Sequence, residues 1–278
     1  MLFRSGLEAA RRYPARFAVM GRMNLRDPQA PALLPAWRQQ SGMLGVRLIF
    51  NSAATAPMLS DGSADWFWPA AEKAGLPVMC HAPELAPQLA RIVERHPQLI
   101  LILDNMGLSQ SLQSAKGGNT VDLIAHTLSL AKFPNVSVKL SSVANHSHED
   151  YPYRDINVHV RRVFDAFGPQ RCHWGSDMTR ALARATYRQR VTHFTEALDF
   201  LSEDDKDLVM GRSLLEWLRT RDAGAEAPDA RIAQLAALPV TDFVDAGERA
   251  LVFTQFTEMG TLLQSHLLEK FHLRVPFL

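Results

Sequence analysis

Two short apolar segments end on side chains that could do chemistry. The segment R-C-H-W-G-S-D-M, residues 171–178, reads as a buried strand that ends at Asp177, and G-L-P-V-M-C-H-A-P, residues 75–83, ends at His81. In α/β barrels the chemistry lies at the carboxyl ends of the strands, so these two residues predict one site at one barrel mouth. Gly175 and Ser176 are small, which lets the backbone there pass close to a neighbour or a ligand.

Each of three charged or amide side chains near other strands has two possible roles. Arg47 lies inside the apolar segment G-V-R-L-I-F and Lys139 inside V-K-L-S, where an unpaired charge is costly. Each could bind a substrate carboxylate, Arg47 in a bidentate way, or form a structural ion pair within the barrel. Asn105 is either a site residue or a turn residue that follows Asp104.

Three further histidines are assigned from their surroundings. His146 and His148 stand in the polar segment A-N-H-S-H-E-D, which favours a solvated loop over a pair of metal ligands. Tyr151 and Arg154 follow closely, so this loop could still lie over the barrel mouth. His173 precedes Gly175 by two residues on its strand and is predicted to pack in a lower layer of the barrel.

Strands and helices alternate along the chain. The helical segments between the predicted strands include 65–74, 87–96 and 121–132, and near-continuous apolar strands are typical of a parallel sheet buried on both faces. A barrel needs eight strands, whereas six are visible and the chain opens on a helix, so a (β/α)8 barrel incomplete at its N-terminus is expected. The predicted strands are residues 17–23, 45–50, 77–81, 99–104, 136–141 and 172–177.

Composition excludes several classes of protein. The chain has 278 residues, 47% of them hydrophobic and 21% charged, with a formal net charge of +1. That length suits one α/β barrel or two small domains, and the near-neutral charge argues against binding to nucleic acid or to an anionic membrane. No apolar segment is long enough to span a bilayer. Cys80 and Cys172 lie in predicted strands and read as buried thiols, which fits a cytoplasmic protein.

A family resemblance follows from the motifs taken in order. G-V-R-L, P-V-M-C-H, L-D-N-M-G, N-V-S-V-K-L-S, Y-P-Y-R-D-I and W-G-S-D resemble the amidohydrolase-related metal-dependent hydrolases over residues 1–222, with the dicarboxylate-lactonase-like branch most similar. The resemblance implies a TIM-type barrel that hydrolyses a lactone or a related carbonyl compound. Other branches decarboxylate aromatic acids, and some members use a divalent metal whereas others need none.

The resemblance also implies roles for particular residues. Asp177 matches the catalytic aspartate, a general base that takes a proton from water, and the alternative is a carboxylate that caps the following loop. His81 matches a histidine that binds metal or donates to the substrate carbonyl, and the alternative is a core histidine. The resemblance gives His81, Asn105 and Asp177 as catalytic residues. Arg47, Lys139, Tyr153 and Arg154 are the residues expected to bind a carboxylated carbonyl substrate.

Metal binding is an open question at the level of the sequence. If zinc or manganese binds, His81 and Asp177 are the expected ligands. The family's first strand usually carries His-x-His, which this sequence lacks, and its Asp-His-x-Gly pattern reads Asp104-Asn105-Met106-Gly107 here. Asparagine can donate a hydrogen bond to an oxyanion, but it is a poor metal ligand and no general base. The site can therefore also be metal-free.

The last fifty residues have a different character. Residues 223–230, A-G-A-E-A-P-D-A, read as a linker, and residues 231–278 predict a small βαβ tail. That tail resembles the start of the second RecA-like lobe of Swi/Snf-type helicases. The ATP-binding glycine-rich loop and acidic box of those helicases belong to their first lobe and are not in this sequence.

Three hypotheses for the function remain. The first is a hydrolase of a lactone or a similar carbonyl compound, and the second is a catalytically inactive remnant, truncated or chimeric, that keeps a ligand pocket. The third, a helicase-related nucleic-acid module, is disfavoured by the charge of +1 and the missing ATP motifs. Since an open barrel exposes strand edges, self-association is a further expectation.

Overall fold

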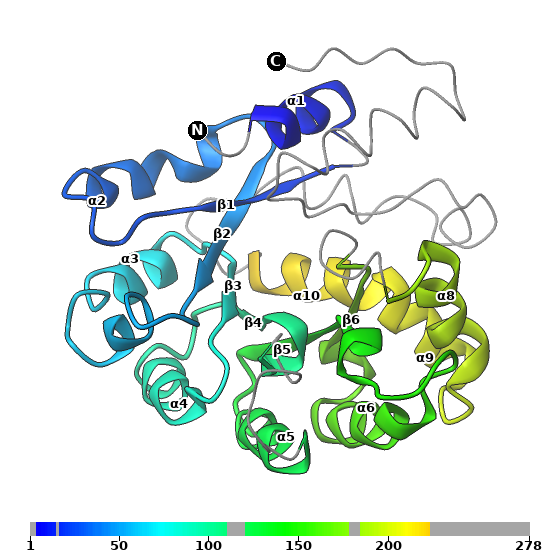
Figure 1. Cartoon of the computed structure of the whole chain (residues 1–278). Coiled ribbons are helices and arrows are strands. Elements are labelled where there is room, and N and C mark those ends of the chain that lie inside the picture. Colours follow the sequence, from blue (N-terminus) through cyan, green and yellow to red (C-terminus); the bar gives the residue numbers. More distant parts are fainter. Residues whose placement is uncertain (1–3, 15–16, 110–119, 178–183, 223–278) are drawn as a thin grey trace.

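The six predicted strands form one parallel sheet in chain order (Figure 1). The structure is a computed structural model that describes residues 4–14, 17–109, 120–177 and 184–222. Each strand hydrogen-bonds to its neighbours in the sequence, which confirms the α/β fold with a parallel sheet. The strands are β1 (Val19–Arg22), β2 (Met43–Ile49), β3 (Val78–His81), β4 (Leu101–Leu103), β5 (Val136–Ser141) and β6 (Cys172–Gly175).

Helices connect the strands and cover one face of the sheet, drawn cyan to green in Figure 1. The predicted helices at 65–74, 87–96 and 121–132 correspond to α3, α4 and α5, with ends shifted by a few residues. The helices of the described chain are α1 (Arg4–Arg12), α2 (Ala30–Leu33), α3 (Phe67–Lys73), α4 (Ala86–Arg95), α5 (Thr120–Leu128), α6 (Arg154–Phe167), α8 (Tyr187–Thr192), α9 (Glu203–Asp207) and α10 (Ser213–Asp222).

Strand β5 shows how the sequence sets the two faces of the sheet. Its residues Val136, Val138 and Leu140 belong to the large core under the helices. The residues between them point to the opposite, inner face, because successive side chains of a strand alternate. Lys139 and Ser141 are therefore carried on the inner face by the same alternation that buries the valines.

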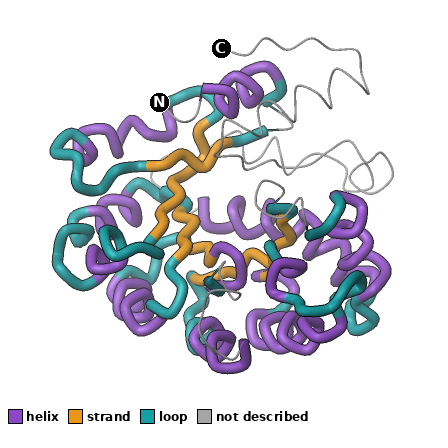
Figure 2. Tube along the Cα trace, in the orientation of Figure 1, coloured by secondary structure: helices purple, strands orange, loops and turns teal. Residues whose placement is uncertain are grey.

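A second apolar cluster lies on the inner face of the sheet. Met20, Met79 and Ile102 from three strands pack there against Trp217 and Leu218 of α10. In Figure 2 this helix runs along the side of the sheet opposite to the outer helices. Helix α10 covers the part of the inner face that lies away from the carboxyl ends of the strands. Other residues line those ends. His173, predicted in a lower layer, is buried there, with its ring centroid 6.4 Å from that of Trp217.

The described part of the chain accounts for a partial barrel. The linker predicted at 223–230 and the helicase-like tail at 231–278 lie outside the described residues. Both cysteines are buried and free, as expected. Among the helices of the described chain, none has the length and apolarity that crossing a membrane requires.

Candidate active site at the carboxyl ends of the strands

Unusual backbone conformations gather where the strands end. Asn105 and Met106 after β4, Ser142 after β5 and Asp177 after β6 have φ values of 52°, 54°, 61° and 42°. Side chains other than glycine rarely adopt this left-handed region, and such residues collect at functional sites where the surroundings hold them in place. The carboxyl edge of the sheet is therefore the first candidate for the functional site.

The turn after β4 explains why the motif Asp104-Asn105-Met106-Gly107 ends in glycine. Gly107 also has a positive φ of 67°, and a Cβ atom there would lie 2.6 Å from Oγ1 of Thr127. That hydroxyl donates to the carbonyl oxygen of Met106 at 2.6 Å. The glycine thus lets α5 approach and lock the turn that carries Asp104 and Asn105.

The Asp104 carboxylate is fully buried between two cations. Nε of Arg47 donates to its Oδ2 at 2.7 Å, the Nη2 of Arg47 contacts the same oxygen, and Nζ of Lys139 lies 2.7 Å from Oδ1. Although burial alone would raise the pKa of Asp104, Lys139 and Arg47 hold it far below its usual value. Arg47 and Lys139 thus each form a structural ion pair with Asp104, which is one of the two alternatives that the sequence offered for each residue.

Gly175 makes room for this ion pair. A Cβ atom at Gly175 would lie 2.9 Å from Cε of Lys139 and 3.1 Å from Cβ of Ser141. These two residues are its neighbours across the β5–β6 pair, where Lys139 is level with His173 and Ser141 with Gly175. The small residue expected at this position therefore serves a close approach by a neighbouring side chain.

His81 ends β3 on the inner face, level with Asp104. It is 2% exposed, and neither ring nitrogen has a hydrogen-bond partner within the described chain. Burial lowers its pKa, whereas the negative charges of Asp104 and Asp177 act in the opposite direction. The imidazole is therefore neutral at pH 7 and has an N–H to offer to a ligand.

The two ends of the Asn105 side-chain amide have different surroundings. Its Oδ1 accepts a hydrogen bond from Oγ of Ser141 at 2.6 Å. The buried Nδ2 has no partner among the described residues. Asn105 thus has a buried N–H at the strand ends while its backbone forms part of the turn after β4, so both roles considered for it in the sequence stay open.

The Asp177 carboxylate sits on the strained turn after β6. The hydroxyl of Ser142 donates to its Oδ2. Buried Arg190 holds the same turn, since its Nη1 donates to the carbonyl oxygen of Ser176 at 2.9 Å and its charge acts on Asp177. Within the described residues, Asp177 has no pair of cations around it like the one that encloses Asp104.

His146 differs from what its polar segment predicted. The expectation of a solvated loop is wrong for this residue: it is 3% exposed, at the end of the turn η4 (Val143–His146). Both ring nitrogens lack a partner in the described structure. Burial and the neighbouring charge of His81 lower its pKa to about 4. His148 is exposed, as expected. The polar composition misled because the turn η4 is buried, although residues 148–150 that follow it are exposed.

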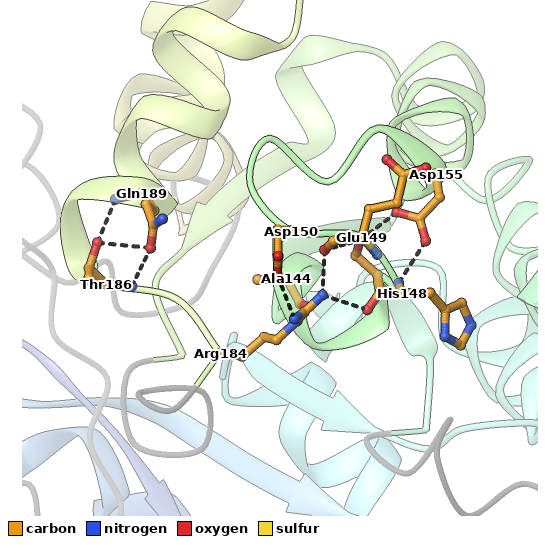
Figure 3. Close-up of polar contacts among 9 residues, drawn as sticks. Ala144, His148, Glu149, Asp150, Asp155, Arg184, Thr186 and Gln189 are labelled. Carbon is orange, nitrogen blue, oxygen red and sulfur yellow. Dashed lines mark hydrogen bonds and ion pairs between the residues drawn. The ribbon is translucent and has the colours of Figure 1, made fainter.

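The loop around His146 is fastened by one arginine (Figure 3). Arg184 donates from Nε to the carbonyl oxygen of Ala144 at 3.2 Å and from Nη2 to that of Ser147 at 3.2 Å. It also contacts Oδ1 of Asp150 at 3.3 Å and the carbonyl of Glu149. The segment after β6 thereby holds the segment after β5.

Tyr153 and Arg154 were both expected to bind substrate, but one is buried and the other is exposed. Tyr153 is buried with its ring edge-on to that of His193 at 5.3 Å, and its hydroxyl has no partner in the described part of the chain. Arg154 is exposed on the first turn of α6. The structure thus brings the Tyr153 ring into the packed loop and leaves Arg154 on the surface.

Arg22 is a candidate that the sequence reading overlooked. It ends β1 directly beside Arg47 of β2 in the sheet register, so the two arginines share the inner face. Partial burial and the charge of Arg47 lower its pKa. Within the described residues it has no ion-pair partner. A charged residue next to the end of the predicted strand 17–23 was the available signal.

The metal expected on His81 and Asp177 has little support from the geometry. Among the described residues, no three His, Cys, Asp or Glu side chains lie close enough together to hold an ion. The site residues present do not fit a metal centre of the usual kind.

Known proteins resemble this chain over most of the described part. The amidohydrolase family model Amidohydro_2 matches residues 4–212. The L-fucono-1,5-lactonase of Burkholderia ambifaria is 28% identical over 181 residues, which cover 62% of this chain and 58% of that protein. The chain thus spans less than two thirds of the length of this relative.

Solved structures share the fold. An amidohydrolase from Burkholderia multivorans with bound HEPES is 23% identical with a TM-score of 0.62, over 72% of this chain and 73% of that one. A second structure of the same description contains zinc, with a TM-score of 0.59, 23% identity, and 72% of each chain covered. A protein assigned as a 2-pyrone-4,6-dicarboxylic acid hydrolase from Pseudomonas putida is 20% identical with a TM-score of 0.62, over 78% and 77%. With the family model covering most of its length, the chain belongs to the amidohydrolase family.

Proposed function

We propose that this protein is a hydrolase that opens a lactone or a related carbonyl compound, with Asp177 as the general base. The observation that carries the proposal is the different state of two carboxylates at one sheet edge. Asp104 is locked between Arg47 and Lys139, whereas the contacts of Asp177 among the described residues are the hydroxyl of Ser142 and the charge of Arg190. Of the two, Asp177 is the one able to accept a proton.

The reaction can be written with the side chains present. A carboxylate oxygen of Asp177 removes a proton from water while the water oxygen adds to the carbonyl carbon. The carbonyl electron pair moves to oxygen, where the N–H groups of His81 and Asn105 donate hydrogen bonds to the negative charge. The oxyanion collapses, the ring C–O bond breaks, and the alkoxide takes the proton back from Asp177.

Buried neutral donors suit this role. Because the ring of His81 and the amide of Asn105 are buried, their hydrogen bonds act in a region of low dielectric, where they stabilise charge better than in water. Neither donor has another partner among the described residues, so neither must break a bond to serve the substrate.

Arg22 supports a carboxylated substrate. It adds a cation beside the inner-face layer of Arg47, Lys139 and Asp104, which leaves a net positive charge before Asp177 is counted. A guanidinium that lacks an ion-pair partner in the described chain can pair with a substrate carboxylate in a bidentate way. The ligand class is thus a small carbonyl compound with a carboxylate, the partner expected from the sequence.

The test is a panel of lactones offered to the purified chain. Acid release on hydrolysis is followed by pH-stat for sugar lactones, with and without a carboxylate, and for a cyclic dicarboxylate. We expect turnover, and Arg22→Ala should raise KM for the carboxylated substrates without a similar rise for the neutral ones. Turnover of no lactone in the panel would overturn the proposal and leave an inactive ligand-binding barrel, which Asn105 in the histidine position favours.

A further inference from the structure

His146 is the strongest unexplained feature of the site. Both of its ring nitrogens are buried without a partner in the described structure, as are those of His81. Buried polar atoms are nearly always hydrogen-bonded, and leaving one unsatisfied is costly. Because neither imidazole has a partner among the described residues, a ligand bound at this place would complete their hydrogen bonds.

The two imidazoles are neighbours in space although 65 positions separate them in the chain. A protonated His81 would lower the pKa of His146, which requires the two rings to lie within electrostatic reach of each other. They come from different elements, since His81 ends β3 and His146 ends the turn after β5. Both therefore lie at the edge of the sheet where Asn105 and Asp177 also lie.

The position of His146 is fixed from both sides. Arg184 binds the carbonyl oxygens of Ala144 and Ser147, which precede and follow it in the loop. Figure 3 shows this guanidinium directed into the loop. A ligand-binding side chain needs this kind of support, because its geometry must be set before the ligand arrives.

We propose that His146 is a further catalytic residue, whose ring N–H donates a hydrogen bond to the substrate carbonyl oxygen beside His81 and Asn105. The inference rests on the proposed function and adds to it a third donor. The proton stays on the imidazole throughout, so the hydrolysis written above keeps its balance. His146 supplies a second imidazole where the motif Asp104-Asn105-Met106-Gly107 carries none.

The charge state of His146 agrees with this role. With its pKa lowered to about 4, the ring is neutral at pH 7 and keeps one N–H. A neutral imidazole can donate to a developing negative charge without bringing a buried positive charge into the free enzyme.

Substitutions in one loop separate this proposal from a structural role. His146→Leu removes both nitrogens at similar volume, whereas His146→Asn and His146→Gln each return one N–H donor near Nδ1 or Nε2. Exposed His148, two positions away, provides the matched control His148→Asn. We expect His146→Leu to lower kcat/KM for the best lactone by about 10²-fold, in the range of a lost oxyanion donor. One of the two amides should restore part of it, and His148→Asn should match the wild type.

Melting temperatures show whether the variants fold. His146→Leu should melt no lower than the wild type, because it removes unsatisfied buried polar atoms. If His146→Leu fails to fold, the two amide variants carry the test, and a difference of more than tenfold between them supports the donor role. An active wild type with kcat/KM in His146→Leu within twofold would overturn this inference and leave the proposed function intact.

A binding measurement covers the case in which no lactone turns over. A lactam keeps the carbonyl oxygen and resists hydrolysis, so its binding to wild-type protein is measured by the shift of ¹⁵N-imidazole NMR signals. A signal that shifts on adding lactam, is absent in His146→Asn and persists in His148→Asn would support the contact. No shift of that signal at saturating lactam, or no lactam binding at all, would overturn it.

Discussion

Two aspartates at the same edge of the sheet have opposite environments. Asp104 is buried between Arg47 and Lys139, which hold its pKa far below the usual range. Asp177 contacts the hydroxyl of Ser142 and stands on a strained turn. Asp104 therefore serves the structure, and Asp177 is the carboxylate that we propose for the chemistry, a division that the residue types alone do not reveal.

Removing Arg47 should destabilise the protein strongly. In Arg47→Ala, the fully buried Asp104 keeps a single cation, so we expect the free energy of unfolding to fall by about 3–5 kcal/mol, as when buried pairs are broken. Urea unfolding followed by circular dichroism measures this loss.

The matched control breaks an exposed pair. Arg26 lies 3.9 Å from Asp61 with both side chains largely in water, so Arg26→Ala should cost less than about 1 kcal/mol. Equal effects of the two substitutions would contradict the assignment of Arg47 to a structural ion pair.

The sequence predicted where two residues of the candidate site lie. Asp177 and His81 could be named because each ends an apolar strand, and strand ends share one edge of a parallel sheet. His146 and Arg22 could not be assigned, because burial of a polar loop and register between two strands are tertiary properties. For Arg47 the residue type left open whether the partner was a substrate or Asp104.

At the scale of elements, β6 and the loops beside it position Asp177, the proposed base. Gly175 lets the Lys139 side chain pass over β6, and the next residues turn to present Asp177. Arg190 and Arg184 then tie the segment after β6 to its own turn and to the loop after β5. The site is thus built across two strand ends rather than on one loop.

Adding a methyl group at Gly175 should disturb the packing of Lys139 against β6. Gly175→Ala places Cβ 2.9 Å from Cε of Lys139, so one of the two must shift and we expect a loss of about 1–3 kcal/mol. Gly6→Ala in helix α1 is the control. Its nearest contact would be an ordinary 3.5 Å, and alanine there should stabilise the helix by about 0.5–1 kcal/mol. Thermal melts with the same sign for both variants would contradict the packing account.

Loss of Arg184 should loosen the loop that carries His146. Arg184→Ala removes the contacts to the carbonyls of Ala144 and Ser147, so hydrogen exchange in residues 143–150 should become faster. Arg188→Ala on exposed α8 is the control and should leave that exchange unchanged. Protection equal to that of the wild type in Arg184→Ala would show that other contacts hold the loop.

The presence and order of the strands were the most predictable features of the fold. Apolar segments of five to seven residues marked all six strands, although several strands are shorter than the predicted segments, since parallel strands buried on both faces need such segments. The position of α10 on the inner face was not predictable. Its sequence pattern indicates an apolar side, but it does not indicate which surface that side contacts.

The whole molecule should lose stability as the pH falls below neutral. Burial lowers the pKa of His146 and His193 to about 4 and that of His173 to about 3. An unfolded chain binds protons at these positions near pH 6.5, so between pH 6.5 and 4 it holds more protons than the folded chain. Stability is therefore full above pH 6.5 and decreases steadily through that interval.

A series of melts tests this linkage. The melting temperature should fall between pH 7 and pH 4.5. His193→Gln should reduce the slope, because Gln keeps an N–H that can donate to Oδ1 of Asn157, now 2.7 Å from Nε2, without titrating. A melting temperature independent of pH over that interval would contradict buried neutral histidines.

The central claim is that Asp177 is the base of a carbonyl hydrolase, and one comparison tests it most directly. The kcat/KM of wild-type protein on its best lactone is measured beside that of Asp177→Asn, which keeps an acceptor for the hydroxyl of Ser142. The account predicts a fall of about 10²–10⁴-fold, with an unchanged melting temperature and full activity in the surface control Asp165→Asn. An Asp177→Asn protein that turns over lactone within twofold of the wild type would contradict it.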